Sequence, residues 1–299
     1  MKELILTDIT DIGDPYVLNY NGTYYMYATS SADGFKVWKS TDLKNWTDCG
    51  LCYFKKDSYG YMDFWAPEVV VRKDGKLVMH FSAKDRQSNG LRIGVAIADK
   101  PEGPFVDAVK DKPMFDLGYC TIDAHCFTDD DGTSYLYYVR DVADNIQDGI
   151  HKSEIYVSKL DETLTKLVGE RVRVTTPEGV EETSLIPDWQ WNEGPFVLKH
   201  NGKYYLNYSY NIFNSKEYSV GVAISDNPMG GFVKVDRNLL RYTDTMSGPG
   251  HNAYFTDNDG QLWCAFHIHT HYDKPSGDRR ACLAPAQFDA DGRLVVRYK

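Results

Sequence analysis

The chain has 299 residues, enough for a large buried core formed by one big all-β domain or by two domains of ordinary size. Hydrophobic residues make up 42% of the sequence and charged residues 25%, values that exclude a disordered chain. The formal net charge of −10 argues against a nucleic-acid partner, because phosphate binding depends on Lys and Arg.

Residues 1–8 contain no long apolar segment followed by a cleavage site, and no later segment is apolar enough to span a bilayer. The six cysteines are scattered through strand-like runs, with Cys49 and Cys52 the one close pair, and we interpret them as free buried thiols, which favours a reducing compartment. We expect a cytoplasmic monomer without a membrane partner. A periplasmic or secreted location is the alternative if a signal peptide has been removed.

One sequence unit recurs five times. Each unit starts with a short strand, turns at Asn-Gly or Asp-Gly and continues into an aromatic strand; the five segments are 14–30, 66–84, 122–141, 193–211 and 250–270. The turn pairs are Asn21-Gly22, Asp74-Gly75, Asp131-Gly132, Asn201-Gly202 and Asp259-Gly260. Both central residues of a type I′ turn need positive φ, which these pairs tolerate best, so each pair predicts a type I′ hairpin.

The spacing of the units predicts the architecture. Successive turn glycines are 53 to 70 residues apart, which leaves room for about four short strands, the content of one propeller blade. The segments 91–105 and 218–232 also match each other, and no helix of three or more turns stands out. The sequence therefore predicts an all-β fold, a five-bladed β-propeller with about four antiparallel strands per blade, in a single domain of residues 1–299. A two-sheet sandwich is the alternative.

The start of each unit is the candidate site, because the first strand of a propeller blade lies nearest the central channel. Four units carry an acid there and the fifth a histidine: Asp14, Glu68, Asp123, Glu193 and His251. Carboxylates that converge on a cavity are costly unless they are protonated, hydrogen-bonded or near a cation, which suggests a use. Hydrolysis of a glycosidic bond needs two carboxyl groups in different protonation states. Alternatively, each acid beside Gly or Pro only caps a turn.

The motifs DPYV, WAPEVV, IDAHCF, EGPFV and GHNAYF, in this order, resemble those of the family 43 glycoside hydrolases. The resemblance covers residues 14–280 and implies a five-bladed propeller that removes arabinofuranose or xylose from plant polysaccharides with inversion of configuration. It further implies that Asp14 is the general base that activates water and that Glu193 is the general acid that protonates the leaving group. Asp123 would orient Glu193 and raise its pKa.

The resemblance also implies ligand-binding residues. His251 matches a channel histidine that in many members lies beside calcium or a similar cation, so His251 is interpreted either as the neighbour of a structural calcium or as an ordinary buried histidine, whereas the chemistry itself needs no cofactor. Arg279 matches an arginine that contacts the sugar, with the neighbouring Arg280 as the alternative.

Aromatic residues near these motifs are candidates for contact with the sugar. Trp65 forms either an aromatic wall of the pocket or a contact between blades. Trp189 and Trp191 flank Glu193, and we expect at most one of them, Trp191, to be a sugar platform. Three alternating histidines share one strand face and are expected to be exposed or hydrogen-bonded rather than a second metal site: His267, His269 and His271.

The larger intracellular β-xylosidases of this family have an extra β-sandwich after the propeller, whereas this sequence stops at Lys299. We therefore expect an α-L-arabinofuranosidase acting on plant cell-wall polysaccharides or oligosaccharides, with β-xylosidase or endo-arabinanase as alternatives. A non-catalytic sugar-binding or scaffold propeller is the rival class, but it does not explain three acids in the family's order. Specificity should depend on the loops 84–89, 141–153 and 211–217, whose conformation the sequence does not predict.

Overall fold

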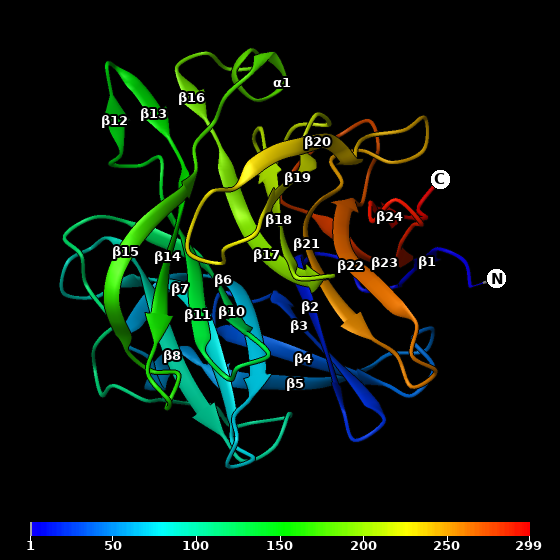
Figure 1. Cartoon of the computed structure of the whole chain (residues 1–299). Helices are drawn as coiled ribbons and strands as arrows, with labels where there is room; N and C mark the ends of the chain where they lie inside the picture. The colour runs from blue at the N-terminus through cyan, green and yellow to red at the C-terminus, as the bar shows by residue number, and fades with distance from the viewer. Residues whose placement is uncertain (1) are drawn as a thin grey trace.

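Five antiparallel sheets, one for each repeated unit, dominate the computed structural model, which describes residues 2–299 (Figure 1). In the first three sheets the strands, named from the channel outward, are β2 (Gly13–Tyr20), β3 (Thr23–Thr29), β4 (Gly34–Ser40) and β5 (Thr47–Phe54); β6 (Gly60–Val71), β7 (Leu77–Asp85), β8 (Leu91–Ala98) and β9 (Val106–Asp107); and β10 (Thr121–Thr128), β11 (Ser134–Arg140), β14 (Glu154–Leu160) and β15 (Leu167–Thr175). In the last two sheets they are β17 (Asn192–His200), β18 (Lys203–Tyr210), β19 (Ser219–Ser225) and β20 (Val233–Leu240); and β21 (Gly250–Thr256), β22 (Leu262–His269), β23 (Arg279–Phe288) and β1 (Ile5–Leu6).

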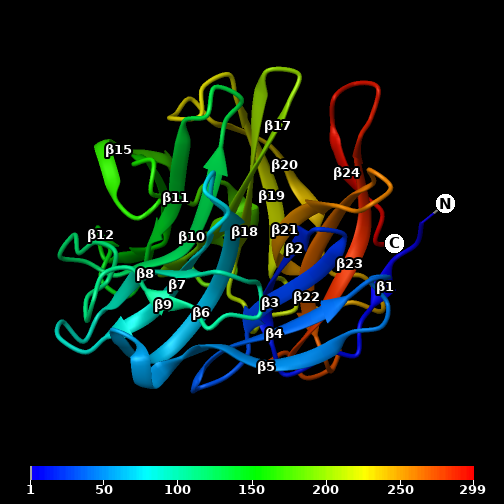
Figure 2. The same ribbon diagram turned by 90° about the horizontal axis from the view of Figure 1, so that it is seen from below.

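The first strands of the five sheets surround a common centre (Figure 2). Each contacts the first strand of the next sheet, in a closed order that runs through β2, β6, β10, β17, β21 and back to β2. The sheets are therefore the blades of a propeller, numbered 1 to 5 in chain order from β2. The predicted five-bladed β-propeller is confirmed. The assignment of the whole chain to one domain stays a prediction.

The hydrophobic core is divided among the interfaces between neighbouring blades, and each interface has its own cluster of buried side chains. Tyrosine suits these interfaces because its ring is buried while its hydroxyl reaches a carbonyl group of the next blade. Tyr27 donates in this way to the Pro101 carbonyl oxygen at 2.8 Å, and Tyr205 donates to that of Gly292 at 2.8 Å. Core packing thus accounts for much of the high tyrosine content.

Blade 5 is completed by segments from both ends of the chain. The N-terminal strand β1 pairs with β23 through Ile5 opposite Leu283 and Leu6 opposite Cys282. The C-terminal strand β24 (Leu294–Val296) pairs with the other end of β23. The two termini consequently lie close to the same blade (Figure 1).

The five predicted hairpins form, but only two have the predicted turn. Positive φ at both central residues occurs at Asn21-Gly22 and Asn201-Gly202. At the three Asp-Gly pairs only the glycine has positive φ. There the turn is a longer loop; for example, the Gly75 N–H donates to the Arg72 carbonyl oxygen and the Arg72 N–H to that of Lys76. The type I′ prediction is wrong for these three pairs, because a type I turn followed by a left-handed glycine satisfies the same hairpin with aspartate in an ordinary conformation.

The remaining elements lie in the connections between blades and in the connection between β11 and β14 inside blade 3. The segment 141–153 is not merely a loop, since it contains β12 (Ile146–Gln147) and β13 (Ile150–Lys152), which form a small sheet with β16 (Trp189–Gln190). The helical segments are η1 (Lys55–Asp57) and α1 (Val180–Thr183). No helix within residues 2–299 has both the length and the apolar character needed to cross a membrane. All six cysteines are unpaired; four are buried, while Cys49 and Cys120 are half-buried, so the expectation of burial is wrong for these two.

Candidate active site

Every inner strand has a β-bulge at the same position. The register shifts immediately after Gly13, Trp65, Ile122, Glu193 and Gly250. The residue that follows has positive φ in each strand: Asp14 (55°), Ala66 (46°), Asp123 (55°), Gly194 (55°) and His251 (49°). Bulges of this kind redirect side chains at the end of a strand. Asp14, Asp123 and His251 are thus structurally equivalent, whereas Glu193 precedes its bulge and Glu68 follows the bulge of blade 2.

Side chains of the preceding blade bind all five bulges, four of them from one register position. The bonds run from the backbone N–H of Ala66 to Thr29 Oγ1 (2.9 Å), of Asp123 to Ser82 Oγ (2.9 Å), of His251 to Ser209 Oγ (2.8 Å) and of Asp14 to His267 Nδ1 (3.1 Å). Each acceptor lies opposite the residue before the bulge of its own blade. Blade 3 has Val139 at that register position, and the Gly194 N–H donates instead to Asp123 Oδ2 at 3.0 Å. Asp123 is thereby tied to the residue next to Glu193.

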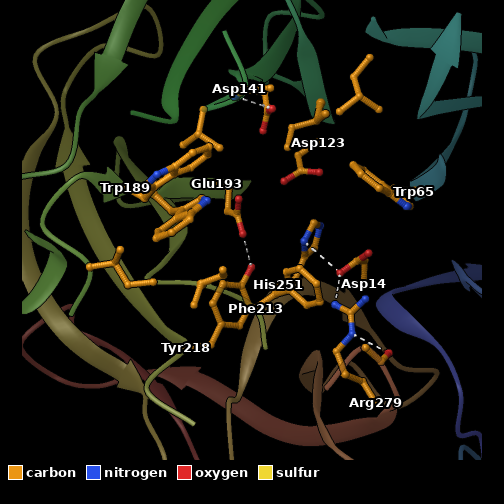
Figure 3. A pocket seen from close by; sticks show the side chains of 18 residues that line it. Asp14, Trp65, Asp123, Asp141, Trp189, Glu193, Phe213, Tyr218, His251 and Arg279 are labelled. Atoms are coloured by element: carbon orange, nitrogen blue, oxygen red, sulfur yellow. Dashed lines mark hydrogen bonds and ion pairs between the residues drawn. The ribbon is translucent and has the colours of Figure 1, made fainter. Parts of the chain in front are cut away.

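A cavity of about 700 Å³ opens where the bulges meet (Figure 3). Its charged and polar lining consists of Asp14, Asp123, Asp141, Glu193, Tyr218, His251 and Arg279. Its apolar lining consists of Trp65, Leu91, Ile122, Val142, Ala143, Ile186, Trp189, Trp191, Ile212 and Phe213. The three acids predicted to be catalytic therefore face one space with the size of a small-molecule site. Glu68 is not among the lining residues and instead pairs with His125 Nδ1 at 2.8 Å.

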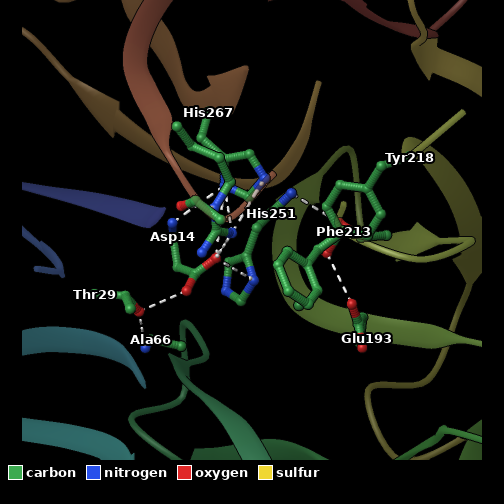
Figure 4. Close-up of polar contacts among 12 residues, drawn as sticks. Asp14, Thr29, Ala66, Glu193, Phe213, Tyr218, His251 and His267 are labelled. Atoms are coloured by element: carbon green, nitrogen blue, oxygen red, sulfur yellow. Dashed lines mark hydrogen bonds and ion pairs between the residues drawn. The ribbon is translucent and has the colours of Figure 1, made fainter. Parts of the chain in front are cut away.

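Asp14 is held by hydrogen-bond donors on both oxygens (Figure 4). Arg279 Nη1 donates to Oδ1 at 2.9 Å, Thr29 Oγ1 donates to Oδ2 at 2.6 Å, and His251 Nδ1 lies 3.3 Å from Oδ1. Burial alone would raise the pKa of Asp14, but Arg279, then His251, and the Thr29 hydroxyl outweigh it and hold this pKa well below its usual range. Asp14 is therefore ionised at neutral pH.

His267 completes this side of the site without adding charge. The ring is fully buried, and burial first and Arg279 second hold the pKa of His267 well below its usual range. A neutral imidazole can accept the Asp14 N–H at Nδ1, as the 3.1 Å distance requires. The positive charge beside Asp14 is thus supplied by Arg279 rather than by His267.

Glu193 has the opposite environment. Its bonded donor is the neutral hydroxyl of Tyr218, 3.0 Å from Oε1, and no cationic side chain pairs with it within residues 2–299. Burial and then the negative charge of Asp123 raise the pKa of Glu193 well above its usual range, against the smaller lowering effect of the Tyr218 hydrogen bond. Burial and the charge of Asp123 thus both favour the protonated form of Glu193.

The pKa of Asp123 depends on charged groups on the other side of the cavity. The side chain is buried, and its Oδ2 accepts the Gly194 N–H. Burial raises the pKa of Asp123 against the lowering effect of His251, and the negative charge of Asp14 adds to the rise. Because its charge in turn raises the pKa of Glu193, Asp123 connects the two sides of the cavity.

Two glycines make room for the partners of these acids. A Cβ atom on Gly13 would lie 1.9 Å from Arg279 Nη2, and one on Gly250 would lie 2.2 Å from the Tyr218 ring. Both glycines precede their bulges, as Glu193 does in blade 4. Their missing side chains let Arg279 reach Asp14 and Tyr218 reach Glu193.

The residues predicted to contact sugar are placed around this centre. Arg279, not Arg280, lines the cavity, and Trp65 lines it as well. Both Trp189 and Trp191 are lining residues, with ring centroids 6.4 Å apart. Trp191 is buried, whereas Trp189 is 38% exposed and stacks on His151 at 3.8 Å. The roles of Trp65, Trp191 and Arg279 in sugar binding stay predictions.

A buried ion-pair network anchors the segment that carries both tryptophans to blade 4. Glu182 in α1 accepts from Lys234 Nζ at 2.5 Å and from Arg237 Nε at 3.0 Å. Lys234 Nζ also donates to Asn192 Oδ1 at 2.8 Å, and Asn192 Nδ2 donates to Glu182 Oε2 at 3.0 Å. Because Asn192 directly precedes Glu193, the network links α1 and β20 to the start of the strand that carries this acid.

The histidines of blade 5 are used in hydrogen bonds or exposed, as expected. His269 bonds Ser247 Oγ at 2.9 Å and the Phe213 carbonyl oxygen at 2.8 Å, while His271 is exposed. Within residues 2–299, no group of three or more His, Cys, Asp or Glu side chains could hold a metal ion. The side chains at His251 do not by themselves form a cation site, and its calcium role stays a prediction.

The lining residues that the sequence did not single out include Asp141, Phe213 and Tyr218, although Asp141 and Phe213 lie in two of the loops predicted to determine specificity. Tyr218 starts the segment shared with blade 2, which identifies it as a strand residue but not as a partner of Glu193. Phe213 lies in the loop 211–217. The Arg279 guanidinium carbon lies over its ring, 5.2 Å from the ring centroid. Asp141 is the last residue of the third repeated segment. None of the other four segments ends in an acid, and this difference is the sequence signal that could have identified Asp141.

Known proteins match this chain over nearly its whole length. Residues 9–294 match the glycosyl hydrolases family 43. A solved structure titled a thermostable family-43 glycoside hydrolase is 42% identical, with a TM-score of 0.93 and coverage of 98% of this chain and 95% of that one. A Bacteroides thetaiotaomicron structure titled endo-1,4-β-xylanase is 36% identical, with a TM-score of 0.84 and coverage of 96% and 95%.

The curated relatives have several specificities. A β-D-galactofuranosidase of Aspergillus niger is 27% identical over 94% of this chain and 81% of its own length. Other curated relatives are named xylosidase/arabinosidase, arabinoxylan arabinofuranohydrolase and endo-arabinanase.

Proposed function

Because the chain belongs to family 43 of the glycosyl hydrolases, it is a glycoside hydrolase, and we propose that it is an inverting α-L-arabinofuranosidase acting on side chains or chain ends of plant cell-wall polysaccharides or oligosaccharides. One observation carries the proposal. Two acids face the same cavity: Asp14, whose surroundings lower its pKa and favour the carboxylate, and Glu193, whose surroundings raise its pKa and favour the protonated acid. Glycoside hydrolysis requires a pair of this kind.

In the proposed reaction, Asp14 takes a proton from a water molecule while the water oxygen bonds to the anomeric carbon. The bond from that carbon to the glycosidic oxygen breaks, its electron pair stays on the oxygen, and Glu193 delivers a proton there. Water attacks the face opposite the leaving group, so the released sugar has inverted configuration. Proton exchange with solvent then restores Asp14 and Glu193.

Asp123 and Arg279 support these steps without entering the bond changes. The charge of Asp123 keeps Glu193 protonated until the leaving oxygen needs the proton, and its bond to the Gly194 N–H fixes it beside Glu193. Arg279 keeps Asp14 ionised and fixes the oxygen Oδ1. The reaction thus uses side chains and water alone.

The substrate assignment rests on the walls of the cavity and on relatives. Trp65, Trp189 and Trp191 give flat apolar surfaces of the kind that pack against the apolar faces of sugars. A cavity of about 700 Å³ suits a chain end or side chain better than the middle of a polymer. Arabinofuranose comes first because several curated relatives are named for it, and β-xylosides come second because others are named xylosidases.

The test is a screen of aryl α-L-arabinofuranosides, β-D-xylosides and β-D-galactofuranosides, followed by proton NMR of the first product. We expect the arabinofuranoside to be hydrolysed fastest, and the sugar to appear first with inverted anomeric configuration. Initial retention would contradict the mechanism. A propeller that only binds sugars or proteins would hydrolyse none of the substrates, and release of internal fragments from linear arabinan would indicate the endo-acting alternative.

A further inference from the structure

A fourth carboxyl group, Asp141, lies at the rim of the same cavity and has no part in the proposed steps. It directly follows β11 of blade 3, where its N–H donates to the Cys120 carbonyl oxygen at 3.0 Å. The residue is 8% exposed and lines the cavity beside Val142 and Ala143. Figure 3 shows it on the side of Asp123 and Glu193, across the cavity from Arg279.

The partners of Asp141 do not neutralise its charge. The Ala143 N–H donates to Oδ1 at 2.9 Å, and the other donor near the carboxylate is the Val142 N–H. Within residues 2–299, Asp141 is in none of the ion pairs, whereas Asp14 pairs with Arg279 and Glu182 with Lys234. Burial raises the pKa of Asp141, the hydrogen bond from the Ala143 N–H opposes this rise, and the negative charge of Asp144 adds to it. The protein thus bears the cost of a buried carboxylate with no counter-charge.

The surroundings indicate what would compensate that cost. Val142 and Ala143 follow Asp141 directly and line the cavity, and Ile186 and Trp189 belong to the same apolar lining, so a bound ligand would meet Asp141 beside apolar side chains. A cation is not required, because a hydroxyl group donates a short, strong hydrogen bond to a carboxylate. Sugars present such hydroxyls beside flat apolar faces.

We propose that Asp141 is a substrate-binding residue that accepts a hydrogen bond from a hydroxyl group of the sugar in the catalytic cavity. This inference deepens the proposed function and depends on it for the identity of the sugar. It assigns to blade 3 a contact that selects among glycosides, in addition to the acid-orienting Asp123.

The competing explanation is that Asp141 only caps its own turn, since aspartate often accepts the N–H two residues ahead. Asp141→Asn separates the two explanations, because the amide oxygen keeps the bond from the Ala143 N–H while the charge is lost. Asp148→Asn is the matched control. It removes the same charge from an exposed residue of the same loop that does not line the cavity.

The measurements are kcat/KM on the best aryl glycoside and on a natural oligosaccharide, and Tm. For Asp141→Asn we expect kcat/KM to fall at least about tenfold with an unchanged or raised Tm, because a charge-assisted hydrogen bond is lost while a buried charge is removed. Loss on both substrates assigns the contact to the released sugar, and loss on the oligosaccharide alone assigns it to the leaving group. Asp148→Asn should match the unmodified protein. Equal kcat/KM for Asp141→Asn and the unmodified protein on both substrates would overturn the inference.

Binding of free arabinose and xylose, followed by tryptophan fluorescence, keeps this test separate from that of the proposed function. If the protein binds a pentose but hydrolyses no glycoside, the proposed function fails, and the Kd of Asp141→Asn for that pentose replaces kcat/KM as the measurement. A rise in Kd of at least about tenfold supports the contact. If no glycoside is hydrolysed and a pentose binds in the cavity with the same Kd in Asp141→Asn as in the unmodified protein, the inference is overturned.

Discussion

At the scale of single residues, the site separates two carboxyl groups by the charges placed next to them. Asp14 has a guanidinium group at 2.9 Å, whereas Glu193 has a neutral hydroxyl at 3.0 Å and a second acid nearby. The low dielectric of the buried site magnifies the influence of each neighbouring charge, while burial itself raises the pKa of both acids and is outweighed only at Asp14. The same functional group can therefore act as a base on one side of the cavity and as an acid on the other.

Asp14→Asn removes the proposed base while keeping a side chain of the same shape. We expect kcat to fall about 10²- to 10⁴-fold, because proton removal from water is lost, with sugar binding retained. Steady-state kinetics on an aryl arabinofuranoside and calorimetric binding of arabinose would measure the two effects. Asp11→Asn, an exposed acid just before the same strand, is the control. A kcat within threefold of the unmodified value would contradict the role of Asp14.

Glu193→Gln removes the proposed acid. The expected loss is about 10²- to 10⁴-fold on substrates with a poor leaving group and much smaller on a dinitrophenyl glycoside, whose leaving group needs little proton assistance. Comparing kcat across aryl glycosides with leaving groups of increasing pKa measures this dependence. Equal losses across the series would argue against proton donation by Glu193.

Asp123→Asn should change the pH profile. The charge of Asp123 raises the pKa of Glu193, and activity requires protonated Glu193, so activity is lost as the pH rises through that pKa. Without the charge this pKa falls, and the alkaline limb of kcat/KM should move to lower pH by about one unit or more. Asp141→Asn should move the same limb less, since its effect on Glu193 is smaller. A limb that stays in place for Asp123→Asn would exclude the electrostatic role.

Which residues the sequence could predict depends on whether their neighbours are local. Asp14, Asp123 and Glu193 were predictable because each stands in a short motif at the start of a repeated unit. Tyr218 was not, because its contact with Glu193 joins positions 25 residues apart through strand pairing and the space left by Gly250. Such contacts exist only after the blades are assembled.

At the scale of elements, the inner-strand bulges set the geometry of the site. The repeats predicted where each inner strand begins, but the one-residue offset of Glu193 from Asp14 depends on the bulge, which a repeat comparison does not reveal. The turn prediction failed in a similar way. Asp-Gly suits both a type I′ turn and a longer loop with one left-handed glycine, and the flanking residues decide between them.

Glu182→Gln tests the network that anchors α1 to blade 4. The change leaves Lys234 buried without its counter-charge, so we expect the free energy of unfolding to fall by about 3–5 kcal/mol. The double variant Glu182→Gln with Lys234→Met removes both charges and should recover much of that stability. Urea denaturation followed by fluorescence would compare the variants. A single variant as stable as the unmodified protein would show that the network contributes little.

At the scale of the whole molecule, the fold follows from the repetition of one unit. Five segments of similar length predicted five blades, and the blades meet through five separate hydrophobic clusters. The closure of the ring was not predictable, because β1 has two residues and no motif that marks it as the outer strand of blade 5. Its pairing with β23 depends on the completed ring.

Deletion of residues 1–8 should therefore weaken the ring at one blade. Besides β1, it removes the bonds from the Thr7 N–H and hydroxyl to the Ala281 carbonyl oxygen at 3.1 and 2.8 Å. We expect Tm to fall by about 5–10 °C. Deletion of residues 1–3, which precede β1, should have a smaller effect. Circular dichroism and fluorescence should report one common transition if the chain is a single domain, and two separated transitions would contradict that assignment.

The valine at position 139 has a consequence for anyone who would build such an enzyme. A propeller assembled from five identical blades would have the same hydroxyl at every bulge and the same residue in front of every bulge. All five sides of its central cavity would then be chemically identical. A proton could not be taken on one side and given on the other. The repeat is broken in blade 5, where His267 replaces the hydroxyl, and in blade 3, where Val139 replaces it and the Asp123 carboxylate bonds the bulge of the next blade instead. Design from a symmetric ring would have to start by breaking the repeat at that register position, before any catalytic group is added.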